Sequence, residues 1–138
     1  MATIPYHTAP TSISTNALPL VGRIGIAAIF VLSGLSKIAA PTATIGYIGM
    51  AGLPVPQVAF AVAVIIELGV SAALVLGYRT RLMAGILALF SVVTALAFHN
   101  SLSDQDQFIH FFKNVAIAGG LLNVMALGGG AWSLDARR

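Results

Sequence analysis

A single acid stands near the middle of a long apolar stretch of this sequence. Residues 58–77 read VAFAVAVIIELGVSAALVLG, and Glu67 is the ionisable side chain among them. Roughly 20 apolar residues suffice to span the hydrocarbon of a bilayer, and an acid at the centre of such a helix costs about 2.5 to 3.5 kcal/mol on insertion scales. We therefore expect Glu67 to face the interior of a helix bundle and to meet a partner there.

Polar side chains that could meet this acid lie on the other apolar segments. Lys37 is near the end of the first segment and Ser33 precedes it by four residues, a spacing that puts both on one helix face. Lys113 and Asn114 lie inside the last segment, and His99 closes the third. In antiparallel helices these groups would reach a similar depth near one membrane surface, with Glu67 somewhat deeper.

Two interpretations of this cluster stay open. In the first, the charges form a buried network that fixes helix register, because buried charges must be paired. Glu67 would then accept from Lys37 or Lys113, and Asn114 would satisfy spare groups. In the second, the cluster lines an outward-opening polar pocket for a small amphipathic molecule, and its excess of positive charge suits an anion, a quinone or hydroquinone oxygen, or a lipid headgroup. The ligand-binding residues would be Ser33, Lys37, Glu67, His99, Lys113 and Asn114.

The remaining polar residues give weaker signals. His99 and His110 flank one polar loop but lack a third obvious ligand, so we predict no metal or haem site. Asp104 and Asp106 alternate in that loop and are expected to be solvated. His7, near the start of the chain, is expected to have no role.

Composition places the chain in the membrane class. Of its 138 residues 58% are hydrophobic and 8% charged, against about 25% charged in soluble domains, and the mean hydropathy is +0.95. The net charge of +3 comes from basic residues near helix ends, which indicates topology signals and no nucleic-acid partner. Cysteine is absent, so redox chemistry would have to belong to a bound small molecule or a partner.

Four apolar segments in succession predict an all-α fold, an integral membrane four-helix bundle. They cover residues 20–40, 58–77, 82–98 and 108–127, lengths that suit bilayer-crossing helices. Residues 19–138 would form this membrane domain. Residues 1–18 are expected to be a disordered or surface-lying tail, and since they contain no Lys or Arg, a cleaved signal peptide is not expected.

The basic residues predict the orientation. Arg79 and Arg81 stand in the short turn between the second and third segments, and Arg137 and Arg138 follow the fourth. An even number of spans puts this turn and both termini on one side, which the positive-inside rule assigns to the cytoplasm. Arg23 lies at this end too, and we expect its long side chain to snorkel to the interface.

Four pieces of the chain, in order, resemble the DoxX family of small bacterial membrane proteins. They are RIGIAAIFVLSGLSKI (23–38), GMAGLPVP (49–56), IIELGVSAALVLGYRTRLMA (65–84) and FFKNVAIAGGLLNVMALGGGAWSLD (111–135). The resemblance covers nearly all of the chain after Leu18. It implies a four-helix membrane bundle, in agreement with the segments above.

The resemblance also implies a functional context. Some DoxX relatives are subunits of thiosulfate:quinone oxidoreductases, and others are linked to quinone or oxidative stress responses. The recurrent polar positions of the family correspond here to Arg23, Ser33, Gly34, Lys37, Glu67, His99, Lys113 and Asn114.

These observations together predict an inner-membrane accessory or quinone-associated component of a membrane oxidoreductase system, more a subunit than a self-sufficient enzyme. Its expected partners are the lipid bilayer, other oxidoreductase subunits and a quinone-like ligand, with quinone as the candidate cofactor. The alternative is a purely structural or assembly subunit without ligand chemistry. A solute transporter is disfavoured, because no spanning segment is visibly broken and no inverted repeat is evident.

Overall fold

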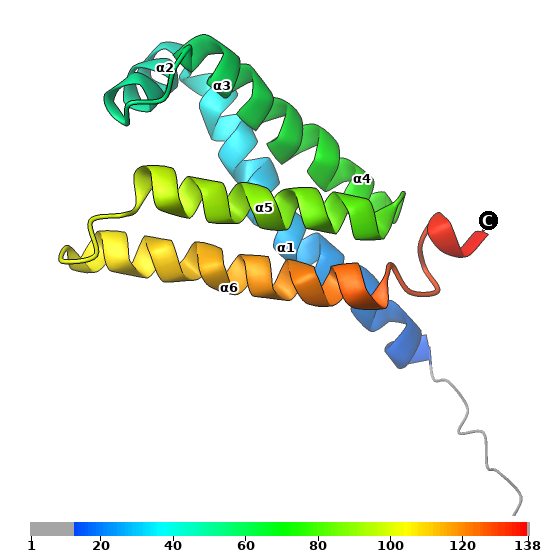
Figure 1. Cartoon of the computed structure of the whole chain (residues 1–138). Coiled ribbons are helices and arrows are strands. Elements are labelled where there is room, and N and C mark those ends of the chain that lie inside the picture. The colour runs from blue at the N-terminus through cyan, green and yellow to red at the C-terminus, as the bar shows by residue number, and fades with distance from the viewer. Residues whose placement is uncertain (1–12, 138) are drawn as a thin grey trace, which may run out of the picture.

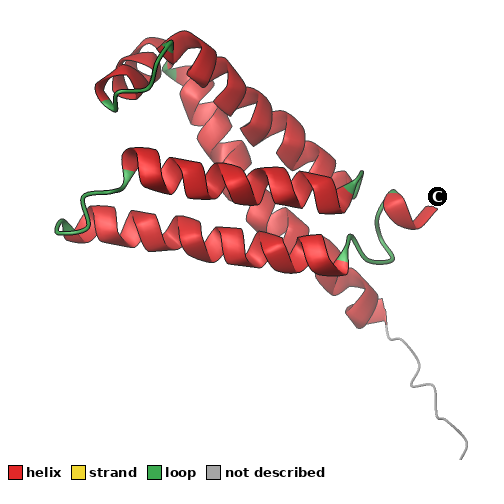
Figure 2. Ribbon diagram, in the orientation of Figure 1, coloured by secondary structure: helices red, strands yellow, loops and turns green. Residues whose placement is uncertain are grey.

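The computed structural model describes residues 13–137, with side chains from Asn16 onward, and contains no strand within that range (Figures 1 and 2). Its elements are α1 (Ile13–Ala39), α2 (Pro41–Met50), α3 (Pro56–Val64), the π-helix η1 (Ile65–Val70), α4 (Ser71–Leu76), α5 (Thr80–Phe98), α6 (Gln105–Leu127) and the 3₁₀ turn η2 (Asp135–Arg137). His7 and most of the expected tail lie outside the described residues.

Four helices are long and apolar enough to cross a membrane, as the sequence predicts. They cover Asn16–Ala39, Pro56–Leu76, Thr80–Phe98 and Gln105–Leu127. The second span consists of α3, η1 and α4, which follow one another without a break. The all-helical membrane architecture is thus confirmed.

The helices extend beyond the apolar runs at several ends. Helix α1 begins at Ile13 and runs through Pro19, so it starts before the expected Leu20. Helix α6 begins at Gln105 because the Asp104 carboxylate accepts a hydrogen bond from the Gln107 backbone N–H at 2.9 Å. This is an N-cap, and Asp104, which we expected only to be solvated, therefore sets where α6 begins.

The connection between the first two spans contains a helix, α2. Pro41 stands in its first turn, where the missing N–H costs nothing. Helix α2 packs against α1 and α3. The Tyr47 ring stacks on the Phe98 ring at the end of α5, with ring centroids 5.5 Å apart.

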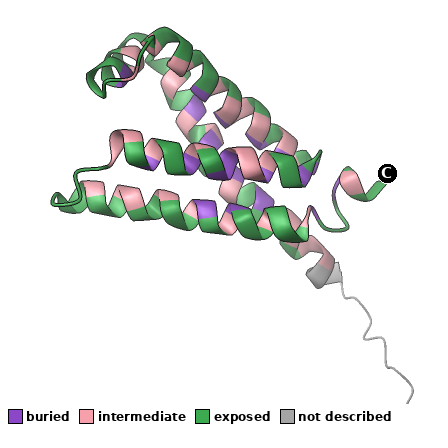
Figure 3. Cartoon of the chain, in the orientation of Figure 1, coloured by how far each residue is buried: buried purple, intermediate pink, exposed green. Residues whose placement is uncertain are grey.

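Helices α5 and α6 form a closely packed antiparallel hairpin that lies across α1 (Figure 1). The buried core gathers where this hairpin meets α1 and α4 (Figure 3). Its residues are Phe30, Leu74, Ala84, Leu87, Ala88, Ala118 and Leu121. Toward the start of α1 the bundle is closed by the segment after α6, whereas toward the end of α1 helices α3 and α5 separate (Figure 1).

The tight turn between α4 and α5 depends on Gly77. Its φ is +71°, the left-handed region that favours glycine. The Gly77 N–H donates to the Leu74 carbonyl and the Tyr78 N–H to the Ala73 carbonyl, which is a Schellman motif. A Cβ at Gly77 would overlap Ser133, so this glycine also admits the returning C-terminal segment.

Candidate functional site

Glu67 is paired with Lys37 across the contact between η1 and α1. The Lys37 ammonium lies 2.9 Å from Glu67 Oε1 and donates to the Ser33 hydroxyl at 2.8 Å. The Ser33 hydroxyl donates to the same Oε1 at 3.1 Å. The Glu67 side chain is 5% exposed and that of Lys37 is 24% exposed, so the acid is enclosed while the base reaches an opening. Of the two lysines predicted as partners, the structure selects Lys37.

The local backbone brings Glu67 close to α1. Glu67 lies in the six-residue π-helix η1, a rare widened turn that recurs at functional sites. Opposite it, α1 presents Gly34, where an added Cβ would lie 2.9 Å from Leu68 Cγ and 3.2 Å from Glu67 Cβ. The absence of a side chain at Gly34 therefore allows this close helix contact.

Half of the Glu67 carboxylate has no partner. Oε2 is buried and accepts no hydrogen bond within the described residues. Ser71, one turn further along the same span, is also buried, and its hydroxyl likewise lacks a partner there. Because a buried acceptor without a donor costs about 1 to 3 kcal/mol, the Glu67 carboxylate is only partly satisfied by its neighbours.

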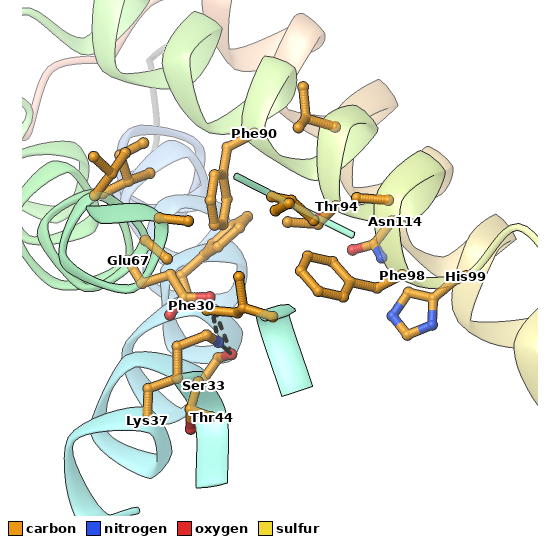
Figure 4. A pocket seen from close by; sticks show the side chains of 18 of the residues that line it. Phe30, Ser33, Lys37, Thr44, Glu67, Phe90, Thr94, Phe98, His99 and Asn114 are labelled. Atoms are coloured by element: carbon orange, nitrogen blue, oxygen red, sulfur yellow. Dashed lines mark hydrogen bonds and ion pairs between the residues drawn. The ribbon is translucent and has the colours of Figure 1, made fainter. Parts of the chain in front are cut away.

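A cavity of about 790 Å³ lies beside this carboxylate, within the range of about 300 to 1,000 Å³ typical of small-molecule sites. Its wall is mostly apolar and includes the rings of Phe30, Tyr47, Phe90 and Phe98. The structure brings all the predicted binding residues to this cavity: Ser33, Lys37, Glu67, His99, Lys113 and Asn114. Polar groups stand at two of its sides, with aromatic rings between them (Figure 4).

The second polar side is formed by the ends of α5 and α6, and its groups bond to one another. The His99 and His110 rings stack with centroids 5.0 Å apart. His99 Nδ1 lies 2.8 Å from Gln107 Oε1, and the Lys113 ammonium donates to His110 Nδ1 at 2.8 Å. The prediction that Lys113 could pair with Glu67 is therefore wrong. The Lys113 ammonium bonds to His110 on its own helix, and Glu67 pairs with Lys37.

Asn114 faces the cavity from α6 (Figure 4). Its side-chain amide makes no hydrogen bond to the described part of the chain, so the role of satisfying Glu67 is not observed. The amide offers both a donor and an acceptor to whatever fills the cavity.

Arg23 forms the other polar centre of the molecule, and the expectation that it snorkels is wrong. Its side chain is fully buried. It donates to the carbonyls of Leu74 at 2.9 Å and Val75 at 2.7 Å, and to that of Trp132 at 2.5 Å. The first two belong to the last turn of α4, where the helix dipole favours a cation; the Leu74 carbonyl also accepts the Gly77 N–H. We call this arrangement the Arg23 clamp.

The segment after α6 completes the Arg23 end of the bundle. The Leu134 and Asp135 N–H groups donate to the carbonyls of Leu76 and Gly77. The Asp135 carboxylate accepts from the N–H groups of Arg79 and Thr80 at 2.8 and 2.7 Å and from the Thr80 hydroxyl at 2.7 Å. Asp135 therefore caps α5 from a distance in sequence, and the C-terminal stretch is part of the fold.

Comparison with known proteins agrees with this architecture. The DoxX family profile matches residues 18–100. The inner membrane protein YphA of Escherichia coli K12 is 34% identical over 125 residues, which cover 87% of this chain and 89% of that protein. The inner membrane protein YqjF of the same organism is 33% identical over 116 residues, covering 84% of this chain and 88% of that protein. No solved structure matches the chain. The chain therefore belongs to the DoxX family and is a multi-pass protein of the inner membrane.

Proposed function

We propose that this DoxX protein binds a quinone or quinol in the cavity beside Glu67. The observation that carries the proposal is the Lys37–Glu67 pair in the wall of a large, mostly apolar cavity, with Glu67 Oε2 still unpartnered. A quinol hydroxyl would donate to the Glu67 carboxylate. A quinone carbonyl would accept from Lys37, whose ammonium has three protons and uses two of them, on Glu67 and Ser33.

The rest of the cavity suits a flat ring. Phe30, Phe90 and Phe98 lie between the two polar sides (Figure 4), and aromatic rings stack on flat rings with a gain of about 0.5 to 1.5 kcal/mol beyond area burial. Asn114 and His99 line the far side and would offer partners to a second polar group of the ligand. A quinone has two oxygens on opposite edges of an apolar ring, which matches this distribution better than a compact anion does.

Electron transfer itself would be carried out by a partner. The chain has no cysteine, and within residues 13–137 there is no group of three or more His, Asp or Glu side chains that could hold a metal ion. We propose that the protein holds quinone beside an oxidoreductase subunit. Purification from native membranes in mild detergent tests this role, and recovery of a quinone without any oxidoreductase would contradict it.

The proposed orientation places both termini in the cytoplasm and the Lys37 end of the bundle toward the periplasm. Arg79, Arg81 and Arg137 all lie at the opposite end from Lys37, and the positive-inside rule supports this assignment. Labelling of single introduced cysteines in intact cells, one at Ser101 and one at Ala136, tests it. Accessibility of the second position alone would contradict it.

Quinone binding to purified protein in nanodiscs tests the site. Glu67→Gln should weaken quinol binding by about tenfold, or about 1.4 kcal/mol, because a carboxylate acceptor is replaced by an amide. Ser71→Ala is the matched control, since it removes another buried and unpartnered polar atom that does not line the cavity. Equal binding by both variants and the parent protein would refute the site.

A structural role without ligand is the second candidate, and the Lys37–Glu67 ion pair favours it because it joins α1 to η1. Under this alternative Glu67→Gln lowers stability or the yield of assembled complex, while the turnover of each assembled complex is unchanged. Glu67→Gln thus separates the two candidate functions: quinone-dependent turnover of each assembled complex falls if Glu67 binds quinone and is unchanged if its role is structural.

A further inference from the structure

The cavity wall continues onto the surface that faces lipid. Val62 on α3 and Leu89 and Val93 on α5 line the cavity, and each is also among the exposed large hydrophobic residues, Leu89 with 66% of its surface exposed. Side chains that both line a cavity and face the bilayer mark the place where the cavity opens. The opening is therefore within the membrane-spanning part of the chain, and we call it the α3/α5 portal, defined by Val62, Leu89 and Val93.

The helix packing explains why the portal exists. Helix α5 packs against α4, η1 and α6, whereas α3 packs against α1, α2 and η1, so among the described elements α3 and α5 share no substantial contact. The second span contacts α5 through α4 and η1, the element that carries Glu67, and beyond η1 the span and α5 separate toward α2 (Figure 1).

The end of the cavity beyond the portal is crossed by an aromatic contact. Tyr47 and Phe98 both line the cavity, one from α2 and the other from the last turn of α5, and their rings stack with centroids 5.5 Å apart. This stack joins the two elements that would otherwise be open to the aqueous side. The portal offers a route into the cavity that runs sideways, from lipid.

We propose that the ligand enters from the bilayer through the α3/α5 portal and that its hydrocarbon chain stays in the portal while its polar ring reaches Lys37 and Glu67. The site thus selects long-chain, membrane-dissolved quinones over water-soluble ones. This inference rests on the proposed quinone function and adds the ligand class and the entry route. Selection arises because a long-chain quinone is concentrated in the bilayer beside the portal, where its chain gains packing contacts on the portal side chains.

Two photoreactive quinones with a ten-carbon chain test the portal, one carrying a diazirine on the ring and the other at the chain end. Both are irradiated with the full-length protein in nanodiscs, with and without excess unlabelled quinone, and the adducts are mapped by mass spectrometry. We expect displaceable ring adducts around Glu67 and Phe90 and displaceable chain adducts on Val62, Leu89 and Val93.

The outcomes separate this inference from the proposed function. Displaceable ring adducts together with chain adducts spread evenly over lipid-facing positions such as Val115 and Leu122 of α6 would overturn the portal and leave the quinone site intact. Ring adducts that excess quinone does not displace would overturn both.

A portal variant gives an independent readout. Leu89→Trp fills the opening and should weaken binding of the ten-carbon quinone about tenfold, with little change for the same quinone without its chain. Val92→Trp is the matched control, because Val92 is also lipid-exposed on α5 but does not line the cavity. An equal loss of both ligands in Leu89→Trp, or the same loss in Val92→Trp, would overturn the portal.

Discussion

The two ends of α1 each place a basic side chain inside the bundle, but in opposite surroundings. Arg23 is fully buried and donates to backbone carbonyls, whose positions are fixed by the fold and do not change when a neighbouring side chain rotates. Lys37 is partly exposed and bonds to a carboxylate and a hydroxyl beside a cavity. The comparison indicates that the first end is a fixed structural joint, whereas the second holds its base at an opening beside a cavity.

The largest loss of stability is expected when the Arg23 clamp is removed. Arg23→Met removes the donors to the Val75 and Trp132 carbonyls and should lower the free energy of unfolding by about 3 to 5 kcal/mol, since each orphaned buried group costs about 1 to 3 kcal/mol. Arg23→Lys should rescue little, because an ammonium cannot reproduce the planar fork of a guanidinium. Thermal unfolding in detergent measures both, and full stability of the lysine variant would contradict the clamp.

A smaller loss is expected from Gly77→Ala, which tests whether the same end depends on close backbone approach. The substitution forces a non-glycine residue to φ +71° and a Cβ onto Ser133, so we expect a loss of about 2 to 3 kcal/mol. Gly69→Ala is the control on the same span, where an added Cβ meets nothing within 4 Å. Similar melting temperatures for the two variants would refute the argument.

At the other end, Glu67→Gln should cost about 1 to 2 kcal/mol of stability. Breaking a fully buried ion pair costs about 3 to 5 kcal/mol, but the partly exposed Lys37 side chain can turn toward water or headgroups. The loss should therefore be smaller than that of Arg23→Met, as measured in the same unfolding experiment. A larger loss would show that the Lys37 end is also a fixed joint.

The smallest effect is expected from Lys113→Ala. Lys113 is exposed and bonds to His110 on its own helix, so its removal should change stability by at most about 0.5 kcal/mol. Unfolding curves of this variant and of Glu67→Gln, measured side by side, compare the stability contributions of Lys113 and of the Lys37–Glu67 pair. A loss as large as that of Glu67→Gln would mean that Lys113 supports the ion pair after all.

Much of the fold follows from hydrophobic patterning, because each spanning segment is long and apolar enough to be recognised alone. The pairing of Glu67 follows from the cost of a buried acid together with the spacing of Ser33 and Lys37 on one helix face. Sequence reasoning did not separate Lys37 from Lys113, because that choice depends on how α1 and α6 are rotated about their axes.

Three features had no usable signal in the sequence. Arg23 looked like an interfacial base because its acceptors are backbone carbonyls, which every residue carries, supplied by Leu74, Val75 and Trp132. The π-helix around Glu67 is a small shift in hydrogen bonding that side-chain patterns do not encode. The capping of α5 by Asp135 joins residues far apart in the chain, and local capping rules consider only near neighbours.

The Arg23 clamp also bears on the order in which the protein is assembled. The first spanning helix carries Arg23, but one of its acceptors, Trp132, follows the last spanning helix in the chain. During synthesis α1 thus reaches the membrane with an unpaired guanidinium, which can bond to α4 once the second span is inserted but to Trp132 only after α6 has been made. Closure of this end therefore follows the insertion of α6, because a segment made after that helix secures the first one.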